Sequence, residues 1–167
     1  MPTRNEYQHQ KDIGGDLQKF MQRIKFESRD NGRTPFQWDN TANAGFTTST
    51  PWIKVNSNYT TINAAAQESD PNSVLNYFRR MVQLRKQEPT LVYGKYTLLD
   101  AQNPDVYVYT RELNGRKLLI LLNFKASAAA VNTGLDLVNA KVLMGNYSNA
   151  YTTGPLKPYE AVVLEIK

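Results

Sequence analysis

Apolar residues recur at helical spacing in the first part of the chain. Residues 1–10 are polar and are predicted to be frayed. After two glycines, Asp16 is a suitable N-cap for a helix. The apolar residues that follow share one face of that helix: Leu17, Phe20, Met21 and Ile24.

A second and stronger helical pattern covers residues 71–88. Asp70-Pro71 resembles a cap followed by proline at the first helical position, and Glu88-Pro89 predicts the end. The apolar positions between them form a broad stripe: Val74, Leu75, Tyr77, Phe78, Met81, Val82 and Leu84. A stripe of this width indicates a helix that is covered on more than one side.

Between the two helices, residues 27–72 show no sustained period. Small polar residues dominate this segment, and five aromatic residues interrupt it: Phe36, Trp38, Phe46, Trp52 and Tyr59. Long loops without secondary structure are uncommon in compact domains unless they are functional. The segment is therefore predicted to pack against a neighbouring structure.

From residue 95 onward the pattern changes to that of strands. Predicted strands cover 96–100, 106–113, 117–124, 128–131, 140–144 and 161–166. Asn114-Gly115 predicts a hairpin, and the nearly continuous apolar run 117–124 is typical of a strand buried on both faces. The predicted fold is mostly β: a Greek-key-like antiparallel β-sandwich over 95–167, preceded by a loop-rich segment and one or two helices.

The composition limits the kinds of functional site that the chain can contain. The chain of 167 residues has no cysteine and one histidine, His9, which excludes disulfides and argues against zinc. No apolar stretch follows the first residues as in a signal peptide, and no apolar run has membrane-spanning length. We therefore expect no cofactor, no metal and no membrane association. The net charge of +5 is scattered, which favours a solvated surface over a nucleic-acid interface.

Carboxylate pairs remain as possible catalysts, because paired acids carry out glycoside hydrolysis. Outside the predicted helix and strands, the candidates are Glu27, Asp30, Asp39 and Asp70. Asp30 lies between two arginines, and a nearby guanidinium favours the ionised form, the opposite of what a general acid needs. Composition and spacing identify no catalytic pair.

One motif is far more specific than these patterns. The segment Ser28-Arg29-Asp30-Asn31-Gly32-Arg33-Thr34-Pro35-Phe36-Gln37-Trp38-Asp39 resembles the signature loop of the oligo-1,6-glucosidase branch of glycoside hydrolase family 13. This branch includes α-glucosidases, dextran glucosidases, sucrose isomerases and trehalose synthases. The resemblance continues at 43–47, at 51–59 and at 91–94, and it covers most of residues 16–95.

The resemblance implies an architecture for the parent enzyme. In this family a (β/α)8 barrel is followed by an antiparallel β-domain. Residues 1–94 would be the C-terminal remnant of the barrel, with its last helix at about 71–88, and residues 95–167 would be the C-terminal β-sandwich. The long aromatic segment and the wide apolar helix face would then both lie against the missing barrel domain.

The resemblance also implies a mechanism that this chain lacks the residues to perform. The family uses an Asp nucleophile and a Glu acid/base in a retaining mechanism, and these groups lie on earlier barrel strands. The chain contains none of those motifs, so we expect no catalytic residues and no activity of the chain alone. An oligosaccharide would be a ligand only in the context of the full-length parent.

One site residue carries over from the family by resemblance. The arginine before Thr-Pro matches Arg33, which implies contact with the terminal glucosyl unit in the parent, with a structural role as the alternative. Arg29 is a weaker candidate for substrate binding and is expected to form a structural ion pair. For Phe36, Trp38 and Trp52, packing is favoured over sugar stacking.

Two other functions compete with the C-terminal part of an α-glucosidase. A free-standing carbohydrate-binding β-sandwich module would use surface aromatic residues as platforms. A basic nucleic-acid binder would use the positive charge. The wide apolar helix face and the signature loop favour the first interpretation over the binding module, and the scattered charge disfavours the nucleic-acid binder. The exposed apolar surface that faces the missing barrel is expected to be covered by another copy of the chain, by crystal neighbours or by disorder.

Overall fold

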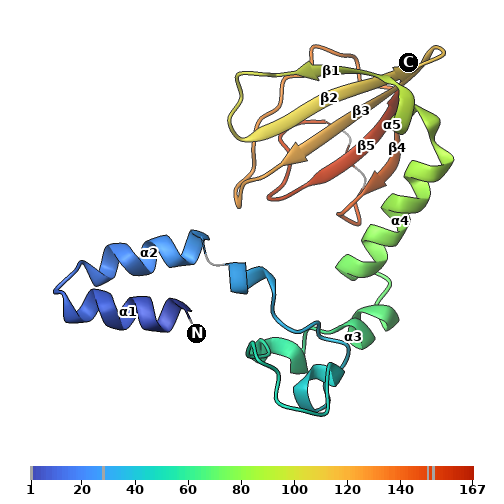
Figure 1. The fold of residues 1–167 in the computed structure, drawn as a ribbon. Helices are drawn as coiled ribbons and strands as arrows, with labels where there is room; N and C mark the ends of the chain where they lie inside the picture. Colours follow the sequence, from blue (N-terminus) through green and yellow to red (C-terminus); the bar gives the residue numbers. More distant parts are fainter. Residues whose placement is uncertain (1, 28, 150, 152) are drawn as a thin grey trace. The chain divides into compact units, whose positions relative to one another are not determined.

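The computed structural model describes residues 2–27, 29–149, 151 and 153–167. The described chain divides into two compact units, one ending at Asp70 and one beginning at Pro71 (Figure 1). The first unit consists of helices and loops, and the second contains two helices and a β-sheet.

The first unit begins with a helical hairpin. Helix α1 covers Pro2–Asp12 and helix α2 covers Leu17–Glu27. The prediction of a frayed start is wrong, because α1 packs on α2 through the rings of Tyr7 and Phe20, whose centroids are 6.0 Å apart. An ion pair of 2.6 Å joins Glu6 to Arg23. Contacts between two helices cannot be predicted from the polar sequence of α1 alone.

The start of α2 agrees with the sequence. The carboxylate of Asp16 accepts a hydrogen bond of 2.9 Å from the backbone N–H of Lys19, as an N-cap does. Phe20 is the one residue that α2 buries among those described.

The segment between α2 and the second unit is more ordered than its sequence predicted. It contains three 3-10 helices, Arg29–Gly32, Ala42–Gly45 and Ser57–Thr60, and a short helix α3 at Ala64–Ser69. Elements of four to six residues are too short to produce a periodic pattern. Two of them begin with a side-chain cap, since Asn56 accepts from Asn58 N and Asn63 accepts from Ala66 N.

Hydrogen bonds between distant residues close this segment into a loop. The first backbone N–H groups of α3, those of Ala64 and Ala65, donate to the carbonyls of Gln37 and Trp38 at 2.9 Å each. Asn63 caps α3 by accepting from Ala66 N at 2.8 Å and donates to the carbonyl of Tyr59 at 2.8 Å. The buried Asn63 thus satisfies the helix start and anchors the preceding turn.

The second unit begins with α4, Val74–Gln87, and α5, Pro89–Tyr93. The predicted start at Pro71 is three residues early, because Ser73 is the N-cap and accepts a hydrogen bond of 3.2 Å from Asn76 N. The predicted break at Glu88-Pro89 is confirmed. These helices group with the sheet as one compact unit, while a domain boundary at residue 95 stays a prediction.

The five strands form one antiparallel sheet in the order β1-β2-β3-β5-β4 (Figure 1). Their bounds are Lys95–Leu99, Val106–Leu113, Arg116–Asn123, Lys141–Gly145 and Ala161–Ile166. The hairpin at Asn114-Gly115 is confirmed, and both residues have positive φ, 50° and 79°, as a type I′ turn requires. The antiparallel β-fold is thus confirmed.

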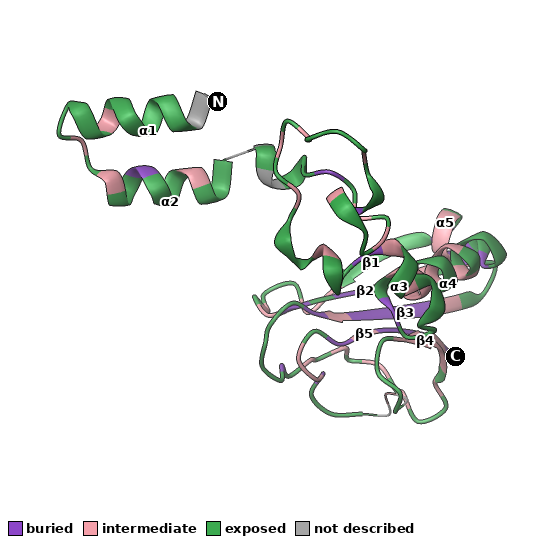
Figure 2. Ribbon diagram, turned by 90° about the horizontal axis from the view of Figure 1, so that it is seen from below, coloured by how far each residue is buried: buried purple, intermediate pink, exposed green. Residues whose placement is uncertain are grey.

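One face of the sheet carries the main core. Buried residues of β2, β3 and β5 alternate onto this face, and the described residues of the irregular segments 124–149 and 153–160 lie over it, with Ala129 and Leu156 in the core (Figure 2). The predicted strand 128–131 is reduced to a single bridge between Ala129 and Leu156. The second layer of the sandwich is therefore irregular, yet it buries Ala129 and Leu156 almost completely.

The opposite face of the sheet is only partly covered. Leu118, Ile120 and Val163 form a small core there, and Leu91 of α5 packs against it. Toward β1 the face is aromatic and partly exposed. The hydroxyl groups of Tyr96 and Tyr107 are 2.9 Å apart, and this hydrogen bond raises the pKa of Tyr96 to about 12.

A buried amide joins the end of β3 to the covering segments. The Nδ2 group of Asn123 donates to the carbonyls of Ser127 at 2.8 Å and Lys157 at 2.7 Å, and its Oδ1 accepts from Lys125 N at 2.8 Å. Asn123 is 4% exposed, so each of these bonds replaces hydration that the backbone groups lose on burial.

Candidate functional site

The loop that carries the family signature begins with a single 3-10 turn. The backbone N–H of Arg33 donates to the carbonyl of Asp30 at 3.2 Å and closes this turn. The Arg33 guanidinium lies 4.0 Å from an Asp30 carboxylate oxygen, and both side chains are about half exposed (52% and 51%). A long, exposed ion pair of this kind is weak and leaves the guanidinium accessible to a ligand.

The motif contains a second arginine, Arg29, of which only the backbone is described. The backbone of Arg29 begins the 3-10 helix, but its side chain lies outside the described part of the structure. The expected ion pair of Arg29 and its weaker candidacy for substrate binding therefore stay predictions.

The aromatic residues after Arg33 are exposed in the first unit. The rings of Phe36 and Trp38 are 4.6 Å apart at an angle of 59°, and each residue is 56% exposed. Trp52 is 78% exposed. Exposed aromatic surface of this extent is typical of groups that contact another molecule or another part of the same protein.

A tight turn after Trp38 fixes the shape of the loop. The carboxylate of Asp39 accepts hydrogen bonds from Thr41, from the backbone N–H at 2.8 Å and from the hydroxyl at 2.5 Å. These bonds hold the pKa of Asp39 below its ordinary value. The chain then passes through positive φ at Asn43, Ala44 and Gly45. A Cβ at position 45 would lie 2.7 Å from the Asp39 carboxylate, so only glycine fits there.

Three of the candidate carboxylates, Glu27, Asp30 and Asp39, have a partner nearby in the sequence. Glu27 lies 3.9 Å from Arg23 one turn earlier in α2, Asp30 pairs with Arg33, and Asp39 is held by Thr41. These partners lie in the same turn or helix as the acid, so the contacts define local shape. The structure thus gives these acids structural roles and does not show them as a catalytic pair.

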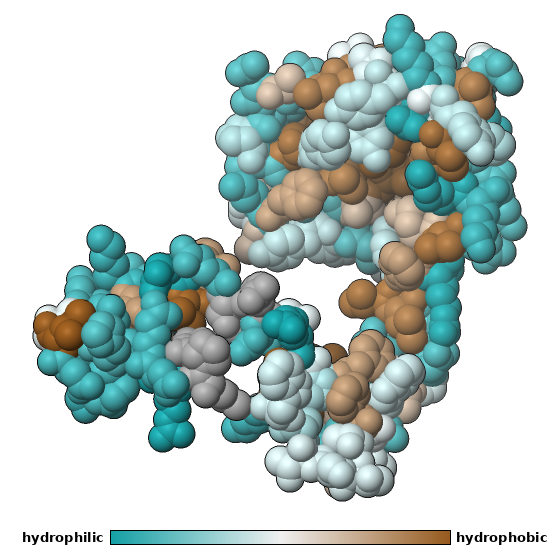
Figure 3. Space-filling model, in the orientation of Figure 1, coloured by the Kyte–Doolittle hydropathy of each residue, from teal (hydrophilic) through white to brown (hydrophobic). Residues whose placement is uncertain are grey.

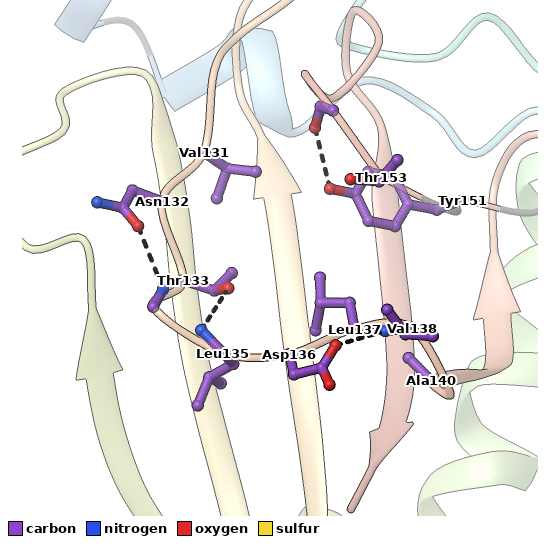
Figure 4. Close-up of a pocket in the computed structure, with 12 residues that line it drawn as sticks. Val131, Asn132, Thr133, Leu135, Asp136, Leu137, Val138, Ala140, Tyr151 and Thr153 are labelled. Carbon is purple, nitrogen blue, oxygen red and sulfur yellow. Dashed lines mark hydrogen bonds between the residues drawn. The ribbon is translucent and has the colours of Figure 1, made fainter.

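The second unit contains a wide pocket in its irregular layer. The pocket of about 840 Å³ lies between segment 131–140 and the residues Tyr151, Thr153 and Gly154 (Figure 4). Its polar side chains make turn hydrogen bonds: Asn132 accepts from Gly134 N, Thr133 from Leu135 N, and Asp136 from Val138 N. Since these groups already serve the loop, the pocket does not present a convergent set of ligand-binding groups.

Within the described ranges, no group of three His, Cys, Asp or Glu residues is arranged to hold a metal ion. Among the same residues, no helix is both long and apolar enough to cross a membrane.

Sequence reasoning missed the residues whose partners are far away in the chain. Asn63, Glu88 and Asn123 are buried polar residues that join separate segments. In the sequence, Glu88 stands out only as the residue before a proline, which predicts a helix end. Their polarity is the one sequence feature that could have identified them, since a polar side chain that is buried needs a hydrogen-bond partner.

The signature loop, the α4 helix and the antiparallel domain together define a glycoside hydrolase of the alpha-amylase type. The profile of the alpha-amylase catalytic domain matches residues 3–94, and that of the maltogenic amylase C-terminal domain matches residues 96–162. The chain belongs to the alpha-amylase family, glycoside hydrolase family 13.

The relatives place the chain more narrowly within the family. It is 39% identical to an oligo-1,6-glucosidase of Parageobacillus thermoglucosidasius over 172 aligned residues, which cover 99% of this chain and 31% of the relative. It is 42% identical to an alpha-glucosidase of Pediococcus pentosaceus over 87% of this chain and 26% of the relative. The chain therefore spans about a third or less of the length of the curated relatives it matches.

A solved structure also matches the chain over nearly its whole length. The trehalose-6-phosphate hydrolase of Bacillus licheniformis matches with a TM-score of 0.87 at 32% identity, over 99% of this chain and 31% of that chain. The chain thus matches 31% of the length of that solved relative.

Proposed function

We propose that this chain is the C-terminal part of a retaining α-glucosidase of the oligo-1,6-glucosidase type. The observation that carries the proposal is the signature loop, in which the accessible Arg33 stands on the 3-10 turn closed by Asp30. The names of the relatives support the reaction class, since they include oligo-1,6-glucosidases and an alpha-glucosidase.

In the full-length enzyme, Arg33 would hold the terminal glucosyl unit. A guanidinium presents several N–H donors in one plane, and neighbouring sugar hydroxyls accept from such a planar group. Its weak pairing with Asp30 costs little to give up when a ligand binds. Arg33 would therefore bind and orient the sugar, while the nucleophile and the acid/base come from the remainder of the barrel.

The isolated chain is expected to be inactive. Incubation with isomaltose, maltose or sucrose should release no glucose above the rate of a buffer control, because the carboxylates near Arg33 serve local structure. A coupled glucose assay measures this result. The matched positive control is a chimera in which this chain replaces the corresponding segment of the Parageobacillus thermoglucosidasius oligo-1,6-glucosidase. Turnover by the isolated chain would contradict the proposal, and so would an inactive but folded chimera.

The same proposal identifies the partner of the exposed apolar surface. Val74 and Phe78 on α4 are 80% and 64% exposed, and apolar side chains gather along this helix (Figure 3). The remainder of the barrel, which would make up most of the parent, is the proposed partner, and in its absence a second copy of the chain would cover part of this surface.

Self-association of the isolated chain is therefore expected. Sedimentation velocity should show a species larger than the monomer whose fraction rises with concentration. Replacing Val74 and Phe78 with serine should shift the equilibrium toward the monomer. The control is Val138→Ser, because Val138 is equally exposed (85%) but lies in the irregular layer of the sheet domain. A chain that stays monomeric at every concentration would refute this expectation.

A further inference from the structure

Helix α4 is held to the sheet by little apolar packing. None of its fourteen residues is buried. A cavity of about 190 Å³ separates Tyr77 and Met81 of α4 from Ile120 and Leu122 of β3. A helix that leaves such a gap gains little from dispersion and from burial against the sheet. Another interaction must therefore fix the position of α4 within this unit.

A cluster of charged groups lies at the C-terminal end of α4. Glu88 connects α4 to α5, and its carboxylate accepts a hydrogen bond from Thr90 N at 3.2 Å. Its other oxygen lies 2.9 Å from Nε of Arg116, the first residue of β3. The Glu88 side chain is only 12% exposed, whereas that of Arg116 is 43% exposed, so solvent reaches the pair mainly from the arginine side.

Arg116 bridges two acids from different elements. Its NH1 group lies 2.9 Å from a carboxylate oxygen of Glu165 on β5, and its NH2 group donates to the other oxygen at 3.2 Å. This two-point geometry fixes the plane of the guanidinium and aims its Nε at Glu88. One arginine thus joins the helical pair to two central strands.

Two more arginines fasten the carbonyl end of α5. Arg111 of β2 donates to the carbonyls of Leu91 at 3.3 Å and Val92 at 2.8 Å. Arg85 of α4 donates to the same Leu91 carbonyl at 3.1 Å. Helix carbonyls carry partial negative charge, so guanidinium groups at this end are favourable.

We propose that Glu88, Arg116 and Glu165 form an acid-sensitive joint that fixes α4 to the β-sheet. Opening this joint releases the helix while the sheet stays folded. The inference goes beyond the proposed glucosidase function, and it can be tested on the chain as it stands.

The charges around Glu88 set the direction of the pH response. Arg116 of β3 contacts both Glu88 and Glu165, while Arg85 of α4 and Arg111 of β2 donate to the Leu91 carbonyl of α5. Alternation along the strands places Glu112 and Lys117 on the opposite face of the sheet. The charge in direct contact with Glu88 is therefore that of Arg116.

Glu88 is the group whose protonation opens the joint. Burial opposes its ionisation, but the hydrogen bonds from Thr90 and the charge of Arg116 outweigh this effect and hold the pKa of Glu88 below its ordinary value. For an acid with a lowered pKa, the stabilisation is complete above the unfolded-state pKa and is lost as the pH falls through the lower folded-state pKa. The joint is thus closed at neutral pH and opens under acidic conditions.

Hydrogen exchange measured by mass spectrometry on the full chain tests the proposal. At pH 7, Glu88→Gln should speed exchange of the α4 amides by about tenfold, because it removes a charge-assisted pair whose carboxylate is mostly buried. Amides of β2, β3 and β5 should keep their protection, which also shows that the variant is folded. Asp105→Asn is the matched control, since it removes the exposed Lys125–Asp105 pair of 3.4 Å at another part of the sheet domain and should leave α4 unchanged.

The pH series and a double variant decide between a joint and a general loss of stability. In the wild-type chain, α4 exchange corrected for the intrinsic rate should rise between pH 5 and pH 3, a range set by the ordinary Glu pKa of about 4.3. Glu88→Gln should abolish most of this rise. Adding Arg116→Gln to Glu88→Gln should change α4 exchange little further. Unchanged α4 exchange in Glu88→Gln, or equal loss of protection in helix and sheet, would overturn the proposal.

Discussion

Replacing Arg33 with lysine in the chimeric glucosidase is expected to lower kcat/KM for isomaltose by about tenfold, and replacing it with glutamine by about a hundredfold. Lysine keeps the charge but loses the planar set of donors, while glutamine loses both the charge and most of the donors. The sugar hydroxyls would then be buried without full hydrogen bonding, which is costly in a desolvated pocket.

The measurement must separate sugar contact from a structural role. Arg33 lies 4.0 Å from Asp30 with half-exposed side chains, so its removal should leave the melting temperature of the chimera almost unchanged. Steady-state kinetics on isomaltose give kcat and KM separately, and loss of ground-state binding appears mainly in KM. Arg79→Gln, an exposed arginine on α4, is the matched control. Variants of Arg33 that keep more than half of kcat/KM would contradict the assignment.

Truncating Leu119 to alanine is expected to destabilise the β-domain by about 3 kcal/mol, within the range known for fully buried leucines. Leu119 is completely buried at the centre of β3, opposite Thr110 of β2 and Leu164 of β5. Neighbours on both sides belong to the hydrogen-bonded sheet and cannot close over the space that the substitution leaves.

Calorimetry is the suitable measurement, because both tryptophans lie in the first unit and do not report on the sheet. The transition of the β-domain should fall by at least about 10 °C, given several degrees per kcal/mol for a unit of this size. Val138→Ala removes a comparable side chain from an 85% exposed position and should leave the transition within about 2 °C. A loss of less than about 1 kcal/mol in the Leu119 variant would show that this core is loosely packed.

The two strongest periodic signals predicted the fold well. The alternating pattern located β2 and β5 at their observed bounds, and Asn114-Gly115 gave the hairpin between β2 and β3. These features are local, because side-chain alternation and positive φ depend on a few neighbouring residues. The start of α4 was predicted three residues too early, because the local sequence offers two possible caps. Asp70-Pro71 and Ser73 are both acceptable helix starts in the sequence. The helix begins after Ser73, whose hydroxyl accepts a capping hydrogen bond from Asn76 N.

The sequence predicted which residue belongs to the candidate site, but not how the folded loop presents that residue. The motif named Arg33, yet its exposure and its long contact with Asp30 are properties of the folded loop. The loop shape depends on bonds across many residues, such as those from α3 to the carbonyls of Gln37 and Trp38. The pattern of residues 27–72 gives no period from which such pairings could be inferred.

The sequence by itself determined the family, the antiparallel character of the C-terminal part and the absence of cysteine chemistry. These follow from a specific motif, from local backbone preferences and from composition. Tertiary structure alone decided that α1 packs on α2 and that residues 128–131 contribute one bridge. It also decided that Arg116 connects Glu88 to Glu165 across 77 positions of the sequence. A charged residue carries no signal that identifies a distant partner, so only the folded chain reveals such pairs.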